Sequence, residues 1–416
     1  MRLSSKTRGL AAIYGSSLML SFGHGMYIPA IPALAASFEV SIGAAAQVVT
    51  AHALGRLVGT PVGGIVVDRV GARVVLLTAP VAIAIAALSI VATPIFLLVL
   101  VAMFFAGAAD STWMMGREIA GLGYVRADQR GRLISGLMGV SSAGMALGPL
   151  LGGGLTELFD YRAVFVAYAV LAAGALPVGM TIRGGASLPR RAPETAASGR
   201  SSSSLLTPIA SVRALRSLLR EIEPQLRPTF GVLVFATFSM MLYRITLHSM
   251  LPLYADAEMG LSPTQIGALF TIQGVVVFFW IMPAGFVLDK VGRKWSTVPS
   301  TAVPGIMFLL YPFADSFLQL AIISMVLGML GGLSLGALAT STYDVIPANA
   351  RGRLQAVRRT IAEVGGVLGP GLGGIIANAH GAGWVFIVYA PVILLSALLL
   401  GVFARETLVK HPAKVD

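Results

Sequence analysis

Ionisable side chains interrupt the long apolar stretches of this 416-residue chain, and they are the residues whose types could do chemistry. One stretch carries Asp110, Arg117 and Glu118, and the spacing of Asp110 and Arg117 places them on nearly the same face of a helix. The other members of this set are Arg56, Arg244, His248, Arg358, Arg359 and Glu363. A poorly hydrated carboxylate can exchange its charge for a proton, and a neighbouring arginine can compete with that proton. We therefore take Asp110, Glu118 and Glu363 as candidate proton-carrying groups.

The stretches that hold these charges are typical of transmembrane helices. Hydrophobic residues make up 56% of the chain and charged residues 12%. Several stretches of roughly 18 to 25 residues carry few charges, which is enough to cross a bilayer. A charge at the centre of such a helix costs roughly 2.5 to 3.5 kcal/mol on insertion scales unless it is paired or faces water, so it usually marks a transport path or a proton relay. One structural alternative is that Arg359 and Glu363, four residues apart, pair on their own helix.

The distribution of charge along the chain predicts its orientation. Basic residues such as Arg69, Arg130 and Lys290 lie at alternate junctions between apolar stretches, whereas Glu157 and Asp315 lie at the others. This asymmetry places both termini in the cytoplasm and requires an even number of spans. It also explains the net charge of +12 without a nucleic-acid partner. Twelve spans are expected near 10–36, 43–66, 74–95, 97–121, 132–156, 162–182, 229–254, 263–285, 295–314, 317–342, 353–377 and 383–404.

The expected domains follow from these spans. Residues 1–182 would form an N-terminal six-helix bundle, and residues 228–416 a C-terminal one. Residues 183–227 read as a cytoplasmic linker, in which residues 208–222 have the apolar and basic faces of an amphipathic helix at the membrane surface. The basic start of the chain leads into an apolar run that we expect to be the first span rather than a cleaved signal peptide. The chain has no cysteine, which excludes disulfides.

A ten-residue pattern occurs twice and relates the two halves. It begins at Gly64 and again at Gly285, an interval of 221 residues (285 minus 64). The same interval relates Gly148 to Gly369, whereas Asp110 falls opposite a glycine and so breaks the repeat. Repetition over separated segments indicates one module used twice. The sequence thus predicts an all-α membrane protein of twelve transmembrane helices in two pseudo-symmetric six-helix bundles.

The repeated pattern, Gly-x-x-x-Asp-Arg/Lys-x-Gly-x-Arg/Lys, resembles the loop motif of the major facilitator superfamily, although Ala72 replaces a basic residue in the first copy. Gly64 would allow a close helix approach, and Gly71 a tight turn. The resemblance implies that Asp68 latches an outward-open state; topology-setting charges are the alternative. The residues assigned to this latch are Gly64, Asp68, Arg69, Gly71, Arg73, Asp289, Lys290, Gly292 and Arg293.

A second motif resembles the one that marks antiporters in this superfamily. It consists of Gly144, Gly148, Pro149, Gly152 and Gly153. Its glycines form a flat face for close packing, and its proline bends the helix. Equivalent glycines in the second half leave plain packing as an alternative. The Arg-x-x-x-Gly-x-Gly motif of drug–proton antiporters is absent, because Met103 and Ala109 occupy its first and last positions.

The sequence and the resemblance together predict a secondary transporter in a bacterial-type inner membrane. We expect proton-coupled efflux of a small amphipathic organic molecule by a monomer that contacts membrane lipids. The expected cavity residues are Arg56, Arg117, Arg244, His248, Tyr27, Trp113, Tyr243, Gln273 and Trp280. No nucleotide-binding motif, cofactor site or metal site is expected.

Three other functions remain open at this point. The three arginines Arg56, Arg117 and Arg244 could clamp an organic anion or zwitterion during uptake or exchange. A lipid-like substrate could pass through a lateral opening. A non-transporting receptor would not need mid-membrane charges that break the repeat. An enzyme is not expected, because no nucleophile–base set is evident.

Overall fold

The computed structural model describes residues 5–126, 129–181, 218–286, 291–334, 337–347 and 350–406. Every regular element within these ranges is a helix. Nine helical segments among the described residues are long and apolar enough to cross a membrane. The prediction of an all-α membrane protein is therefore confirmed.

The first half contains eight helices and one short 3₁₀ turn among its described residues. They are α1 (Ser5–Met26), η1 (Ile28–Ala30), α2 (Ile31–Ser37), α3 (Ile42–Val70), α4 (Ala72–Ala92), α5 (Phe96–Leu122), α6 (Arg130–Leu158), α7 (Tyr161–Gly174) and α8 (Leu176–Thr181). The first expected span, 10–36, is divided between α1, η1 and α2. Pro29 and Pro32 lie at this division, where the missing N–H of each ring interrupts the helical ladder.

The second half repeats this order. Its described elements are α10 (Arg227–Ala257), α11 (Pro263–Phe286), α12 (Arg293–Leu310), η5 (Tyr311–Phe313), α13 (Phe317–Ser334), α14 (Ala337–Val345), α15 (Arg351–His380) and α16 (Ala382–Phe403). Three expected spans fall outside the nine apolar segments and correspond to α3, α12 and α7 with α8. The total of twelve spans stays a prediction, as does the cytoplasmic position of the termini.

Most of the expected linker, 183–227, lies outside the described residues, so its bounds stay predictions. The described end of its expected amphipathic helix begins at Leu218. Leu218 and Ile222 are buried and Arg220 is exposed. This agrees with one apolar face and one basic face over that short stretch.

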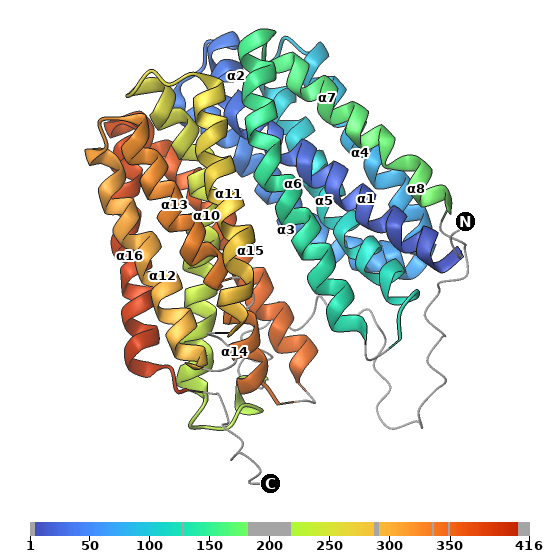
Figure 1. Cartoon of the computed structure of the whole chain (residues 1–416), viewed down its shortest axis with the longest axis vertical. Helices are drawn as coiled ribbons and strands as arrows, with labels where there is room; N and C mark the ends of the chain where they lie inside the picture. Colours follow the sequence, from blue (N-terminus) through green and yellow to red (C-terminus); the bar gives the residue numbers. More distant parts are fainter. Residues whose placement is uncertain are drawn as a thin grey trace.

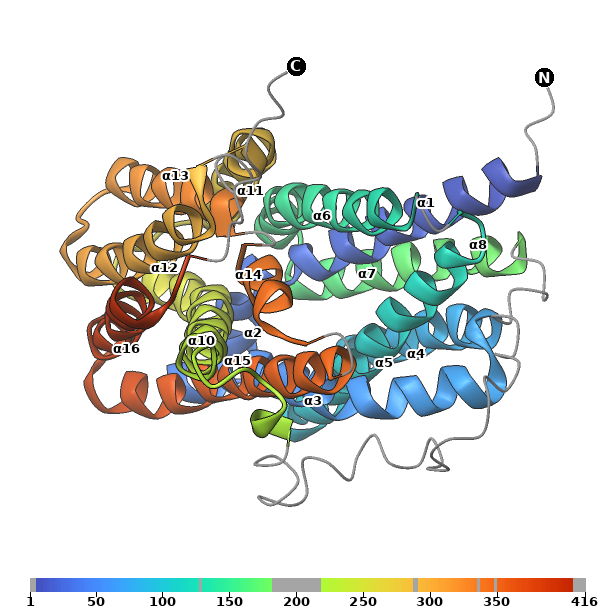
Figure 2. The ribbon, with the colours of Figure 1, turned by 90° about the horizontal axis from the view of Figure 1, so that it is seen from below.

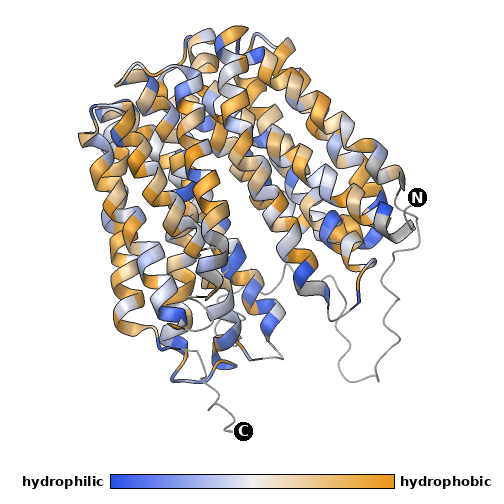
Figure 3. Ribbon diagram, in the orientation of Figure 1, coloured by the Kyte–Doolittle hydropathy of each residue, from blue (hydrophilic) through white to orange (hydrophobic). Residues whose placement is uncertain are grey.

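The helices form two bundles, one from α1 to α8 and one from α10 to α16 (Figure 1). Figure 2 shows the two bundles side by side from below. Hydrophobic residues predominate along the helices of both bundles (Figure 3). Among them, Phe105, Phe279 and Leu372 have exposed side chains. Large exposed apolar side chains are favourable against acyl chains and unfavourable against water. The two bundles converge at one end and diverge towards the other (Figure 1).

Glycines allow the bundles to touch where they converge, and we call Gly43, Gly153, Pro263 and Gly374 the closed end. A Cβ on Gly153 of α6 would overlap the carbonyl oxygen of Pro263 in α11. A Cβ on Gly374 of α15 would overlap the carbonyl oxygen of Gly43 in α3. Gly153 and Gly374 are one repeat interval apart, so the two contacts are pseudo-symmetric. Backbone contact of this kind is the usual role of small residues between membrane helices.

Hydrogen bonds across the bundles accompany the glycine contacts at the closed end. The Gly43 amide donates to Asn378 Oδ1 at 2.8 Å, and Gln47 Nε2 donates to the Gly371 carbonyl at 3.4 Å. On the pseudo-symmetric side, the Thr264 amide donates to Glu157 Oε2 at 3.2 Å. Hydrogen bonds thus join the two bundles on both pseudo-symmetric sides of the closed end.

The other glycines of the second motif pack inside the first bundle. A Cβ on Gly144, Gly148 or Gly152 of α6 would overlap the backbone of α1. Gly365 and Gly369 make the equivalent approach from α15 to α10. The motif therefore joins α6 to α1 through three glycines and to the opposite bundle through Gly153.

Replacing Gly153 by leucine should open the closed end. Overpacking costs about 1 to 3 kcal/mol. Because about 1.4 kcal/mol changes an equilibrium tenfold, the fraction of molecules in which the closed end is open should rise about tenfold. Ala46→Cys provides a reporter, because Ala46 is fully buried beside Gly374 at the closed end and the chain has no other cysteine. The measurement is the rate of maleimide labelling in membranes.

Gly154→Leu is the matched control for this experiment. A Cβ on Gly154 meets its nearest neighbour, Thr264 Oγ1, at 4.0 Å, so a larger side chain has room there. Labelling of Ala46→Cys should stay at its original rate in this variant. Equal rates in the Gly153 and Gly154 variants would show that the contact does not hold the closed end.

Candidate functional site

Arg56 of α3 stands between two carboxylates from two other helices. Its Nη1 lies 3.5 Å from Asp110 Oδ2 on α5, and its Nη2 lies 3.5 Å from Glu363 Oε1 on α15. We call Arg56, Asp110 and Glu363 the charge triad. Because α15 belongs to the second bundle, the Arg56–Glu363 pair joins the two bundles. Glu363 thus pairs with Arg56 rather than with Arg359, which is exposed.

Close helix packing brings the triad together. A Cβ on Gly55 of α3 would overlap the Phe104 carbonyl of α5, and a Cβ on Gly107 of α5 would overlap the His52 carbonyl of α3. Gly55 adjoins Arg56 in sequence, and Gly107 lies about one turn before Asp110. Sequence reasoning missed Gly55 and its neighbours Gly59 and Gly63. Their spacing of four residues, typical of close helix packing, was the available signal.

The triad carries unequal charge in a poorly hydrated place. The side chains of Asp110 and Glu363 are 13% and 8% exposed, and that of Arg56 is 22% exposed. Two carboxylates and one guanidinium give the ionised group a net charge of −1. Charges interact strongly and are costly to desolvate in such surroundings. Binding one proton would make the group neutral.

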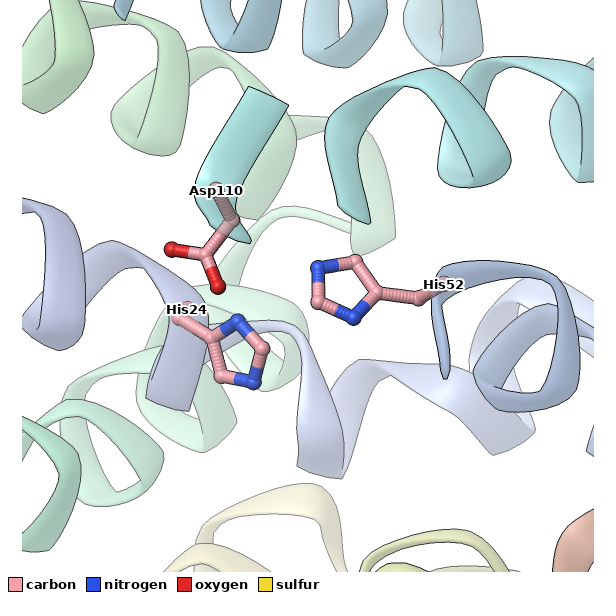
Figure 4. A group of neighbouring side chains, drawn as sticks. All are labelled: His24, His52 and Asp110. Atoms are coloured by element: carbon pink, nitrogen blue, oxygen red, sulfur yellow. The ribbon is translucent and has the colours of Figure 1, made fainter. Parts of the chain in front are cut away.

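Two histidines also lie beside Asp110. His24 of α1 and His52 of α3 have ring centroids 4.7 Å apart, and Figure 4 shows both rings beside the Asp110 carboxylate. One nitrogen from each ring and one Asp110 oxygen lie within 4.8 Å of one another. Arg56 also pairs with Asp110. The two rings thus extend the polar cluster around Asp110 from α3 to α1.

Arg117 is enclosed within the first bundle. It is 2% exposed, its Nη1 donates to Ser141 Oγ of α6 at 2.7 Å, and its guanidinium lies 4.9 Å from the centroid of the Trp113 ring. Ser141 was not singled out from the sequence. Glu118 is half-buried on the next position of α5 and forms no ion pair with a described residue. Arg117 and Trp113 thus pack between α5 and α6.

A cavity of about 140 Å³ lies between the bundles. Helix α6 and Ile28 of η1 contribute one wall, and α10, α11 and α13 contribute the rest. Four of the expected cavity residues line it, namely Tyr243, Arg244, His248 and Gln273.

The other five expected cavity residues lie elsewhere. Arg56 belongs to the charge triad, and Arg117 and Trp113 are enclosed as described above. Tyr27 is buried, with its ring centroid 5.2 Å from that of His24. Trp280 is exposed on α11 and is not part of the lining. The apolar pattern does not indicate which helix face turns inward. The sequence therefore could not show which of the nine residues line the cavity and which five do not.

The expected latch residues of the first half lie at the junction of α3 and α4. Gly71 has φ +87°, so the expected glycine turn is present. Asp68, Arg69 and Arg73 are exposed, and Asp68 forms no ion pair with a described residue. Gly64 meets Met115 at an ordinary van der Waals distance of 3.5 Å, so the close approach expected there is made by Gly63 instead.

The second copy of the latch is only partly described. Asp289 and Lys290 lie outside the described residues. Gly292 has φ +151°, and Arg293 Nε lies 3.1 Å from Asp344 Oδ2 on α14. The backbone amide of Arg293 donates to Glu406 Oε1 at 2.9 Å, which places a carboxylate at the N-terminus of α12.

Removing the Arg56 charge should destabilise the protein, because it leaves two carboxylates without their cation. Breaking a buried ion pair costs about 3 to 5 kcal/mol, so Arg56→Gln should lower the melting temperature in detergent markedly. Adding Asp110→Asn and Glu363→Gln should restore it, since no unpaired charge then remains. Arg126→Gln, at an exposed position, is the control. An Arg56→Gln protein that melts like the original chain would contradict the assigned ion pairs.

Comparison with known proteins places this geometry in a family. The family model described as Major Facilitator Superfamily matches residues 13–254 and 233–416. The crystal structure of a D-xylose–proton symporter has the same fold, with a TM-score of 0.71 and 17% identity over 96% of this chain and 98% of that one.

Curated relatives include transporters of differing substrate. The "Probable sulfoacetate transporter SauU" of Cupriavidus necator is 29% identical over 184 residues, and "Multidrug resistance protein MdtG" of Proteus mirabilis is 30% identical over 165 residues. These matches cover 44% and 38% of this chain, and only 42% and 40% of the two relatives. "Multidrug resistance protein 2" of Bacillus subtilis is 22% identical over 90% of this chain and 91% of its own length.

The family match spans both bundles, and the apolar helices agree with a multi-pass protein of a bacterial inner membrane. The protein is thus a transporter rather than an enzyme. The chain belongs to the major facilitator superfamily.

Proposed function

We propose that this protein couples the entry of protons to the export of a small amphipathic organic molecule. The observation that supports this most directly is the sharing of Arg56 between Asp110 and Glu363. The triad has one more carboxylate than it has cations, so it can accept one proton without adding net charge to the membrane interior. It also lies where the two bundles meet, so a change in its charge can affect both.

Protonation of Glu363 would change the contact between the bundles. A neutral Glu363 loses its charge-assisted bond to Arg56, while Arg56 stays paired with Asp110 inside the first bundle. Helix α15 is then held to α3 less strongly, and the bundles can tilt about the site. His24 and His52 lie beside Asp110 and can carry protons to it. The charge triad thus both binds the proton and regulates the contact between the two bundles.

The relatives support export as the direction. Two of those compared are named as multidrug resistance proteins, and the Bacillus protein aligns with nearly the whole chain. The glycine motif of α6 resembles that of antiporters, and its last member, Gly153, forms one of the contacts at the closed end. The cavity combines polar side chains with apolar ones such as Met145 and Phe270, as an amphipathic substrate requires.

Substrate addition to everted vesicles should cause proton movement that depends on the triad. With an imposed pH gradient and a pH-sensitive dye, the original chain should respond to a transported compound. Asp110→Asn and Glu363→Gln should each reduce the response at least tenfold, because a neutral amide cannot exchange a proton. Exchange of labelled substrate without a gradient should persist in at least one of them, since it needs no net proton transfer.

Asp256→Asn is the control, because Asp256 is an exposed acid near the end of α10. It should respond like the original chain. Undiminished proton movement in both Asp110→Asn and Glu363→Gln would remove the triad from the coupling mechanism.

A further inference from the structure

The repeat places the cavity and the charge triad at equivalent positions of the two halves. An interval of 221 residues relates Arg56 to Val277, and Asp110 to Gly331. The same interval relates Ser142 to Glu363. Val277, Gly331 and Ser142 all line the cavity. The crevice between α3, α5 and α15 is thus filled by three ionised side chains, and its counterpart between α11, α13 and α6 is left open by smaller ones.

The open crevice holds an arginine that forms no ion pair with an acidic residue in the described part of the chain. Arg244 of α10 is exposed and lines the cavity. It forms no ion pair or hydrogen bond with a described residue, and the lining includes no aspartate or glutamate. The guanidinium thus lines the cavity with its N–H donors available to an occupant. Its positive charge favours a negatively charged one.

The remaining lining divides into a polar part and an apolar part. Tyr243, Gln273 and Ser142 offer hydroxyl and amide donors, and His248 lies one turn from Arg244. The apolar part is formed by Ile28, Met145, Met240, Leu247 and Phe270. An occupant with an anionic head and an apolar body would match both parts.

The cavity has room for such a body. Its volume of about 140 Å³ is close to that of an engineered protein cavity of about 150 Å³ that binds benzene. A benzene-sized ring or a short aliphatic chain therefore fits.

We propose that Arg244 binds the carboxylate or sulfonate of a small amphipathic monoanion whose apolar body occupies this cavity. This proposal rests on the proposed function in one respect: it takes the cavity as the site where the substrate binds. A guanidinium offers paired N–H donors that match the oxygens of either group. Arg56 and Arg117 take no part, because the first is paired with two carboxylates and the second is enclosed between α5 and α6. The duplicated crevice has thus become a coupling site in one copy and an anion site in the other.

A set of ring compounds of one size tests the charge preference. Binding of benzoate, benzenesulfonate, benzamide and benzylamine is measured on the purified full chain in phosphatidylcholine nanodiscs. The two anions should bind at least tenfold more tightly than the neutral amide, and benzylamine should bind weakest. Repeating the titration with phosphatidylglycerol present separates a free anion from a lipid headgroup, because a headgroup that occupies the site would compete with benzoate.

Variants of Arg244 test the assigned residue. A hydrogen bond to a charged group contributes about 1.5 to 3 kcal/mol, so Arg244→Gln should weaken benzoate binding about tenfold or more. Arg244→Lys should retain part of the affinity, and Arg126→Gln should retain all of it. Melting curves of each variant establish that the protein remains folded, and benzamide binding should be nearly unchanged in Arg244→Gln.

The outcomes separate this proposal from the proposed function. Tighter binding of benzylamine than of benzoate, failure of all four compounds to bind, or full benzoate affinity in Arg244→Gln would each overturn the anion site. Benzoate binding that depends on Arg244 but causes no proton movement in vesicles would support the site and contradict proton coupling. Proton movement driven by an amphipathic cation, undiminished in Arg244→Gln, would do the reverse.

Discussion

A single guanidinium that serves two carboxylates from different bundles is the constraint on which this structure depends. Arg56 lies within salt-bridge distance of both Asp110 and Glu363 in a poorly hydrated interior. Loss of one partner from a buried pair costs about 3 to 5 kcal/mol, a large part of the roughly 5 to 15 kcal/mol that stabilises a typical domain. Helix packing at this level therefore has little freedom, and Gly55 and Gly107 hold the α3 and α5 backbones in contact beside the charges.

Duplication explains why the two halves share one helix arrangement although the side chains at their centres differ. The closed end is pseudo-symmetric, since Gly153 and Gly374 make the same kind of contact with the opposite bundle. The centre is not symmetric, because the positions equivalent to the charge triad carry small or uncharged side chains that line a cavity. Symmetric contacts suit a rocking motion, and an asymmetric centre allows the proton and the substrate to occupy separate places.

The fold followed from hydropathy and repetition, whereas the site followed only in part. Long apolar stretches and the Gly64–Gly285 interval predicted the helices and the two-bundle order, and Gly71 was correctly assigned to a turn. The partner of Glu363 and the enclosure of Arg117 were not predicted. Helices that are apolar on nearly every side have no periodic pattern to indicate which face packs inward. Contacts between residues hundreds of positions apart depend on how each helix is rotated about its axis. The sequence therefore indicated which residue types belong to the site, but not which of them contact one another.

Coupling of the proton to the bundle interface through Glu363 is the central claim, and one distance measurement tests it directly. Ser37 of α2 and His380 of α15 are exposed near the closed end on opposite bundles, and both can carry spin labels in this cysteine-free chain. The distribution of distances between the labels should shift between high and low pH in the original chain, and should be the same at both pH values in Glu363→Gln. A pH-dependent shift that persists unchanged in Glu363→Gln would contradict the account.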